Sequence, residues 1–283
     1  MYVIAGVSGH VGSVIASELL AKGKAIKVIV RDAEKGKAWS SKGAEVAVGS
    51  LADSGFLALT LKGATGFFTL LPPDFGAAHI FESQKRTSDA IAAAVKEATV
   101  PHVVMLSSVG AELESGTGPI RGLNYLEKVL GETGTKLTAI RAGYFQENVG
   151  NMLAPAKAQG IFPNFTPSQD YPMPMIATKD IGLLAAECLL APKAETIDLA
   201  GPAYSIRQLA EKLGSSLGKP LQIVDIPPEQ HVGAMLQAGM PAPWAESYAE
   251  MYAAFSAGKV TPKGDRLVQG TTTLDEVIKT LVG

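Results

Sequence analysis

The first 32 residues restrict the possible fold more than any other part of the chain. Tyr2–Ala5 is a short apolar segment typical of a buried strand, and it leads directly into the glycine-rich turn Gly6–Gly12. Apolar residues then recur at helical spacing as far as Gly23, and Ala25–Val30 has the composition of a second buried strand. A strand, glycine turn, helix and strand within roughly 30 residues form the βαβ unit in which a glycine motif binds a dinucleotide.

Each glycine of the turn has a physical function in such a site. Gly6 allows the tight turn out of the strand, Gly9 lets the backbone approach a pyrophosphate, and Gly12 lets the helix pack close to the sheet. The helix that follows presents free N–H groups and the positive end of its dipole to phosphates. The spacing is G-x-x-G-x-x-G rather than G-x-G-x-x-G, so a glycine turn without a ligand is the alternative interpretation.

Strands and helices continue to alternate through the first half of the chain. Segments typical of strands are 44–48, 64–71, 102–106 and 136–141, and segments with helical spacing are 33–42, 54–61, 80–99 and 121–132. This alternation predicts an α/β fold of the Rossmann type, a doubly wound parallel sheet with helices on both faces. A change of composition near Gly150 predicts an NAD(P)-binding domain at 1–150 and a smaller C-terminal substrate lobe at 151–283, partly interleaved with the sheet.

The second half of the chain has a different amino-acid composition. Prolines and aromatic residues dominate 155–174, which predicts an irregular segment lined by aromatic side chains. The helical stretch around Cys188 is followed by a predicted strand at 196–199, which is expected to extend the sheet. A helix at 205–217, a strand at 222–226 and an interrupted helical region at 229–257 complete the lobe. The methionines of this last region are most simply core residues, with an apolar lid over a substrate pocket as the second interpretation.

Composition and charge exclude several classes of function. Apolar residues make up 47% of the chain and charged residues 18%, which is sufficient for a large buried core. The net charge of −2 and the lack of basic clusters argue against nucleic acid or a membrane as a partner. The scattered histidines have no metal-ligand spacing, and no G-x-S-x-G motif is present. A single cysteine, and a first strand that begins at Tyr2 without room for a signal peptide, predict a cytoplasmic protein.

The end of the second strand carries the charges that distinguish the two nicotinamide cofactors. An acidic side chain there usually binds the ribose hydroxyls of NAD, whereas the 2′-phosphate of NADP needs a cation. Arg31 and Lys35 suit the phosphate, which a guanidinium can bind with two hydrogen bonds. Asp32 would favour NAD, but it is also a good N-cap for the helix that follows. We therefore expect NADP as the cofactor, with NADPH preferred over NADH.

Ligands of open α/β sheets bind beyond the carboxyl ends of the strands, so the segments after the fourth, fifth and sixth strands are candidates for the nicotinamide site. Lys128 could hold the nicotinamide ribose and lower the pKa of a neighbouring proton donor, or it could be an ordinary surface lysine. The predicted cofactor-binding residues are Gly6, Ser8, Gly9, His10, Val11, Gly12, Arg31, Lys35, Leu70, Leu71, Pro72, Ser107, Lys128, Gly143, Tyr144 and Phe145. The predicted catalytic residues are Lys128, Asn124 and Ser107.

The chain resembles the NmrA-like, atypical branch of the short-chain dehydrogenase/reductase superfamily along nearly its whole length. The resemblance rests on Gly6-x-x-Gly9-x-x-Gly12, Val30-Arg31-Asp32, Gly49-Ser50-Leu51-Ala52-Asp53, Ser107-Ser108 and Ala142-Gly143-Tyr144-Phe145-Gln146-Glu147-Asn148. It implies a Rossmann domain with a small substrate lobe. It also implies one of the family's activities, which include NADPH-dependent quinone reductases, reductases of azo and triphenylmethane dyes, and redox-sensing regulators without turnover.

One position departs from the wider superfamily, whose typical members carry Tyr-x-x-x-Lys with the tyrosine as proton donor. Asn124 stands four residues before Lys128, and Tyr125 is displaced by one position, or about 100° around a helix. A ketone that accepts hydride becomes a basic alkoxide and benefits from a placed acid. A quinone or a cationic dye gives a far more stable product, and water can complete its protonation.

We therefore expect an NADPH-dependent oxidoreductase that transfers hydride to a planar, electron-poor acceptor such as a quinone or dye. Its partner would be a small aromatic or quinone-like substrate, oriented in a pocket lined by Tyr144, Phe145 and the 155–174 segment. The protein would be a monomer or a homodimer. The alternative is an NADP(H)-sensing regulatory protein with little or no turnover. A sugar-nucleotide epimerase or dehydratase is disfavoured by the missing Tyr-x-x-x-Lys register.

Overall fold

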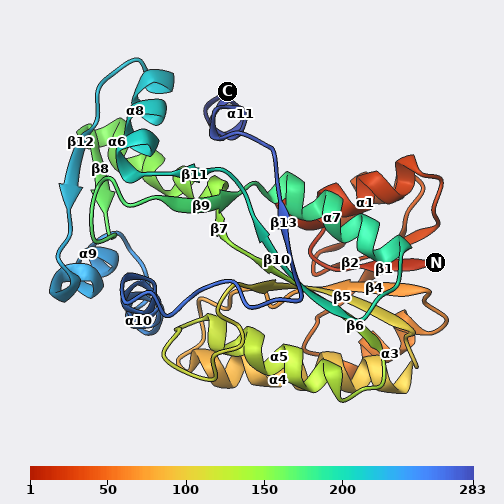
Figure 1. The fold of residues 1–283 in the computed structure, drawn as a ribbon. Coiled ribbons are helices and arrows are strands. Elements are labelled where there is room, and N and C mark those ends of the chain that lie inside the picture. The colour runs from red at the N-terminus through yellow and green to blue at the C-terminus, as the bar shows by residue number, and fades with distance from the viewer.

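The computed structural model describes all residues from 1 to 283 and is built around one eight-stranded sheet (Figure 1). Its strands are β1 (Tyr2–Ile4), β2 (Ile26–Val30), β3 (Glu45–Val48), β4 (Gly66–Thr69), β5 (His102–Ser108), β6 (Lys136–Ala142), β10 (Glu195–Ala200) and β13 (Arg266–Gln269). Their order across the sheet is β13-β10-β6-β5-β4-β1-β2-β3, and every neighbouring pair is parallel. The strand order 3-2-1-4-5-6 within it is that of a dinucleotide-binding sheet, so the predicted Rossmann-type fold is confirmed.

Helices cover both faces of the sheet. The helices of one face are α1 (His10–Ala21), α2 (Ala33–Ser40) and α7 (Thr178–Leu190), and those of the other are α3 (Ser54–Leu61), α4 (Ile80–Glu97) and α5 (Ile120–Gly131) (Figure 1). Successive strand residues alternate between the two cores: Ile4 and Phe68 pack under α1 and α7, whereas Val3 and Phe67 pack under α3, α4 and α5. Full burial of such a side chain contributes about 1.5–3 kcal/mol, so this alternation determines which face each helix covers.

The C-terminal lobe lies beside the carboxyl edge of the sheet (Figure 1). Its strands are β7 (Tyr144–Phe145), β8 (Ile161–Asn164), β9 (Met173–Ile176), β11 (Ala203–Tyr204) and β12 (Gln222–Asp225). They form a three-stranded sheet, β11-β9-β7, and a two-stranded sheet, β12-β8. Its helical segments are η1 (Gln146–Met152), α6 (Leu153–Gln159), α8 (Ile206–Leu217), η2 (Pro228–Gln230), α9 (His231–Gln237), α10 (Ala242–Ser256) and α11 (Leu274–Val282).

A third hydrophobic core holds the helices and strands of the lobe together. Its buried members include Phe162, Met175, Leu209 and Ile278. The chain leaves the lobe twice to rejoin the large sheet, first with α7 and β10 and later with β13. The strand expected at 196–199 therefore extends the sheet, as β10 beside β6. The division of the chain into domains at residue 150 stays a prediction.

The structure corrects two expectations about the lobe. The proline-rich segment 155–174 is not irregular throughout, because it contains the end of α6, all of β8 and the start of β9. Pro163 is tolerated in β8 because this strand belongs to a two-stranded sheet and has a free edge. The sequence did not predict β13 or α11. No helix is both long enough and apolar enough to cross a lipid bilayer.

Candidate functional site

The glycine turn between β1 and α1 forms a cradle that side chains would fill. Gly6 has a φ of +71°, in the left-handed region, and a Cβ there would lie 2.4 Å from Cδ2 of Leu70. A Cβ on Gly12 would lie 2.4 Å from the carbonyl oxygen of Gly6. Gly9 precedes α1 and offers no side chain to cap the first N–H groups of the helix. These N–H groups are therefore open to an anion, as the pyrophosphate of a dinucleotide requires.

The other predicted cofactor residues near this turn differ in exposure. Ser8 and His10 are exposed at its mouth, whereas Val11 is buried under it. Leu70–Pro72 follow β4 and are half-buried, with Leu70 against Gly6. These residues surround the point between β1 and β4 where the strand order reverses, which is the usual position of a ligand in such sheets.

Two free cations stand at the end of β2. Arg31 and Lys35 are exposed, and neither forms an ion pair or a side-chain hydrogen bond. Asp32 is engaged as the N-cap of α2, as expected, since its Oδ1 accepts a hydrogen bond of 2.9 Å from the backbone N–H of Glu34. The uncommitted charges at this strand end are therefore positive, which suits a phosphate better than ribose hydroxyls.

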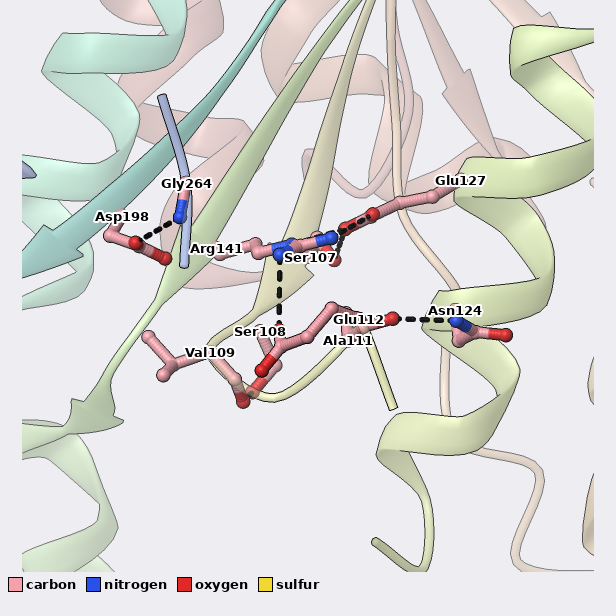
Figure 2. Close-up of polar contacts among 10 residues, drawn as sticks. All are labelled: Ser107, Ser108, Val109, Ala111, Glu112, Asn124, Glu127, Arg141, Asp198 and Gly264. Atoms are coloured by element: carbon pink, nitrogen blue, oxygen red, sulfur yellow. Dashed lines mark hydrogen bonds and ion pairs between the residues drawn. The ribbon is translucent and has the colours of Figure 1, made fainter. Parts of the chain in front are cut away.

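A charged cluster lies between β5, β6 and α5, and we call it the Arg141 cluster (Arg141, Glu127, Glu112, Ser107 and Asp198; Figure 2). Arg141 donates from Nε and Nη2 to Glu127 at 3.0 and 2.6 Å, and from Nη1 to Glu112 at 3.0 Å. Ser107 Oγ donates to Oε1 of Glu127 at 2.5 Å, and Asp198 is the cross-strand neighbour of Arg141. Burial alone would lower the pKa of Arg141, but the hydrogen bonds to Glu127 and the surrounding carboxylates raise it. Arg141 therefore stays cationic.

The residues of α5 that the sequence singled out point in different directions. Asn124 Nδ2 donates to the carbonyl oxygen of Ala111 at 2.8 Å and so holds the loop after β5 (Figure 2). Tyr125 Oη donates to Asp89 on α4 at 2.7 Å. Lys128 is exposed, and its side chain forms no hydrogen bond or ion pair. Helix α5 thus supplies an amide to the loop after β5, but it supplies no phenol there.

A cavity of about 480 Å³ lies between the carboxyl edge of the sheet and the lobe. Val109, Gly143 and Gly201 contribute to it from the ends of β5, β6 and β10, and these strands lie on the side of the sheet where the nicotinamide of a bound dinucleotide is expected. Phe162 and Tyr171 of the proline-rich segment line its outer wall. Of its 26 lining residues, none is Lys, Arg, His, Asp or Glu. The cavity is therefore an uncharged and largely apolar binding site.

Two tyrosines from distant parts of the chain meet in this cavity. Tyr144 follows Gly143 on β7, and Tyr252 comes from α10 and stacks on Phe165 with ring centroids 5.5 Å apart. Burial raises the pKa of both phenols, and each hydroxyl is close enough to influence the other. Both therefore keep their protons at neutral pH. Phe145, in contrast, packs against the core under α1 and α7.

Helix α10 also contacts the loop that follows β4. Trp244 Nε1 donates to the carbonyl oxygen of Asp74 at 2.9 Å, and Phe75 packs on the indole with ring centroids 4.9 Å apart. Trp244 is buried. The helix therefore connects the cavity to a loop at the expected nicotinamide end of the site.

The sequence did not single out Tyr252 or, apart from Ser107, any residue of the Arg141 cluster. Arg141 carried a signal, because a charged residue in an apolar strand must find buried partners. No signal in the sequence indicated Tyr252, because only the folded lobe brings α10 against β7.

The strand order, the open glycine cradle and the adjacent apolar cavity define a dinucleotide-binding α/β protein with a separate site for a second small molecule. The model of the NmrA-like family matches residues 2–278, and the chain belongs to this family. It is 28% identical over 256 residues to the NAD(P)H azoreductase of Xenophilus azovorans, an alignment that covers 89% of this chain and 86% of that protein.

The fold is similar to that of two solved reductases. The triphenylmethane reductase of Citrobacter sp. matches with a TM-score of 0.83 and 23% identity, covering 99% of each chain. The NADPH-dependent quinone oxidoreductase QOR2 of Escherichia coli, complexed with NADPH, matches with a TM-score of 0.74 and 22% identity, covering 100% of each chain. At these identities the similarity establishes the fold.

Proposed function

We propose that the protein is an NADPH-dependent oxidoreductase that reduces a planar, electron-poor acceptor such as a quinone or a dye. The observation that carries this proposal is the division of the sheet's carboxyl edge into two halves. One half has an open helix N-terminus and free cations, and the other has an uncharged aromatic cavity. The names of the related azoreductase, triphenylmethane reductase and quinone oxidoreductase support the same chemistry.

In this proposal the chain's residues mainly bind and orient the two reactants. The backbone of the glycine turn binds the pyrophosphate, and Arg31 and Lys35 bind the 2′-phosphate. Leu70–Pro72 and Gly143 border the nicotinamide, which supplies the hydride when the cofactor is bound. The cavity excludes water and holds the acceptor ring against the nicotinamide, so that the protein contributes orientation rather than acid catalysis.

We propose that Ser107 and Asn124 position the part of the chain that borders the nicotinamide and the acceptor. Ser107 connects β5 to the Arg141 cluster through Glu127, and Asn124 fixes the loop that leads from β5 to the cavity. Lys128 is proposed to hold the nicotinamide ribose. Its exposure and its lack of a protein partner leave its ammonium group available for this contact.

The test measures NADPH and NADH binding and oxidation with a panel of quinones, azo dyes and enones. Replacing Arg31 by Ala removes charge-assisted hydrogen bonds, so we expect the Kd for NADPH to rise about tenfold or more while that for NADH changes by less than about twofold. Arg86→Ala is the matched control, because Arg86 is exposed on α4, away from the glycine turn. Lys128→Met, measured in parallel, should weaken both cofactors if Lys128 contacts the ribose they share.

Two results would contradict the proposal. Equal loss of NADPH and NADH binding in Arg31→Ala would remove the basis for a 2′-phosphate site. Tight NADPH binding without oxidation by any acceptor would instead favour an NADP(H)-sensing regulatory protein.

A further inference from the structure

We propose that the acceptor is an uncharged, oxygen-bearing ring compound, and that the hydroxyls of Tyr144 and Tyr252 donate hydrogen bonds to its oxygen. This inference rests on the proposed function and specifies the substrate class of the same site. It excludes acceptors that carry a sulfonate or carboxylate on the ring that enters the cavity.

The lining of the cavity favours an uncharged ligand. No cationic or anionic side chain lines it, and its walls include Phe162, Phe165 and Phe255. A buried anion needs a cation or several hydrogen-bond donors to offset its loss of hydration. Arg141 cannot serve, because its three donor nitrogens are already bonded to Glu127 and Glu112. A sulfonate in this cavity would therefore have no cationic partner and only neutral hydrogen-bond donors.

The two phenols of the cavity favour a ligand that bears an oxygen atom. Tyr144 and Tyr252 come from the sheet edge and from α10, and their hydroxyls lie close together in a cavity without charged side chains. The two hydroxyls lie within hydrogen-bonding reach of each other, and that of Tyr144 also of Asn148, whereas the hydroxyl of Tyr125 donates to Asp89 outside the cavity. A hydrogen bond between two hydroxyls uses only one of their two O–H donors, and a ligand oxygen placed beside the pair can accept from both.

The chemistry of the reaction gives this pair a function. Reduction of a quinone adds two electrons and one proton as hydride, oxidises NADPH to NADP⁺, and leaves one negative charge that is delocalised onto the acceptor oxygen. Hydrogen bonds from two preorganised O–H groups stabilise this charge as it develops. Because burial raises the pKa of both phenols, they keep their protons, and the proton that completes the hydroquinone comes from water.

The experiment compares a neutral naphthoquinone with a naphthoquinone that carries a ring sulfonate. Steady-state oxidation of NADPH gives kcat/KM, and quenching of tryptophan fluorescence in the NADP⁺-loaded protein gives binding without turnover. The sulfonate makes the ring more electron-poor, so chemistry alone would favour it. We expect the neutral quinone to bind at least about tenfold more tightly and to react with the higher kcat/KM, because an unpaired buried polar group costs affinity.

Phenol-to-phenylalanine variants test the hydrogen bonds. Tyr252→Phe and Tyr144→Phe should each lower kcat/KM for the neutral quinone by about three- to tenfold, the usual effect of losing one hydrogen bond. Tyr125→Phe is the matched control, because its hydroxyl bonds Asp89 outside the cavity, and it should retain the wild-type value. Thermal unfolding of each variant shows whether it remains folded.

A gain-of-function variant tests the charge argument independently of folding defects. Ser256 is exposed, lines the cavity and is the last residue of α10, where a lysine is compatible with the helix dipole. Ser256→Lys should improve binding of the sulfonated quinone relative to the neutral one.

Three outcomes would overturn the inference: equal affinity for the two quinones, unchanged kcat/KM in both tyrosine variants, or loss of the same size in Tyr125→Phe. If no acceptor oxidises NADPH, the proposed function fails, and the fluorescence comparison still decides which ligand the cavity accepts.

Discussion

Replacing Arg141 by Met should destabilise the protein strongly, because it removes the one cation among three carboxylates. The side chains of Arg141 and Glu127 are 9% and 14% exposed, and that of Glu112 is 25% exposed. Asp198 is 2% exposed and has one oxygen without any partner. Methionine preserves most of the volume of Arg141, so the variant isolates the loss of charge and hydrogen bonds from the creation of a cavity.

The magnitude follows from the burial of the partners. Removing one member of a buried ion pair typically costs about 3–5 kcal/mol, because the remaining charge has no compensation. Glu112 is the most exposed of the three carboxylates and can regain water, so we place the expected loss at the lower end, about 3 kcal/mol. For a chain of 283 residues this loss corresponds to a decrease in Tm of about 5 °C.

Urea unfolding followed by far-UV circular dichroism measures this free energy. Lys37→Met is the control, because the Lys37–Glu34 pair has side chains 72% and 71% exposed and should contribute less than about 1 kcal/mol. The double variant Arg141→Met, Glu127→Gln should recover part of the loss, because the amide oxygen introduced at position 127 would still accept the hydrogen bond from Ser107 without an unpaired charge. A loss in Arg141→Met no larger than that in Lys37→Met would refute the reasoning.

Two further predictions concern the glycine turn and the acid side of the stability profile. Gly12→Ala places a Cβ against the carbonyl oxygen of Gly6, so Tm should fall and added NADPH should no longer raise it, as thermal unfolding with and without the cofactor would show. The Arg266 hydrogen bond, assisted by Lys193, lowers the pKa of Glu195 from 4.5 to about 2. Its contribution to stability is therefore present above pH 4.5 and is lost as the pH falls towards 2, so Glu195→Gln should have a flatter stability profile across that window in acid-titrated urea unfolding.

The first half of the fold was predictable because its signals are local. In β1, α1 and β2 the apolar spacing identifies each element, and right-handed connections between parallel strands then place helices on both faces of the sheet. The N-cap role of Asp32 was predictable for the same reason, since the cap and the helix it serves are adjacent in sequence.

The lobe was less predictable because its pairings are short and join distant residues. β11 has two residues and pairs with β9 about thirty positions earlier, and β12 pairs with β8 across an even longer separation. β13 has the mixed sequence Arg266 to Gln269, in which Leu267 is exposed and Val268 is half-buried, so neither alternation nor a continuous apolar run identifies it. Its place at the sheet edge beside β10 depends on the completed fold.

The site shows the same division between local and non-local signals. The glycine turn and Arg31 lie on one βαβ unit, so their proximity could be inferred from spacing alone. The Arg141 cluster joins a strand, a loop and a helix, and the tyrosine pair joins β7 to α10, roughly one hundred positions away. A single sequence indicates that Arg141 needs a partner, but it does not indicate which carboxylate provides it.

The position of the phenols has a consequence for which acceptors the site can reduce. In our proposal Tyr144 and Tyr252 donate hydrogen bonds but retain their protons, because burial raises the pKa of each. An alkoxide formed from an ordinary ketone needs a proton donor matched to the working pH, which a buried phenol without a neighbouring cation does not provide. A quinone delocalises the transferred charge over its own ring, so hydrogen bonds and orientation are sufficient. The presence of Asn124 in place of a helix tyrosine and the uncharged cavity therefore favour the same class of acceptor.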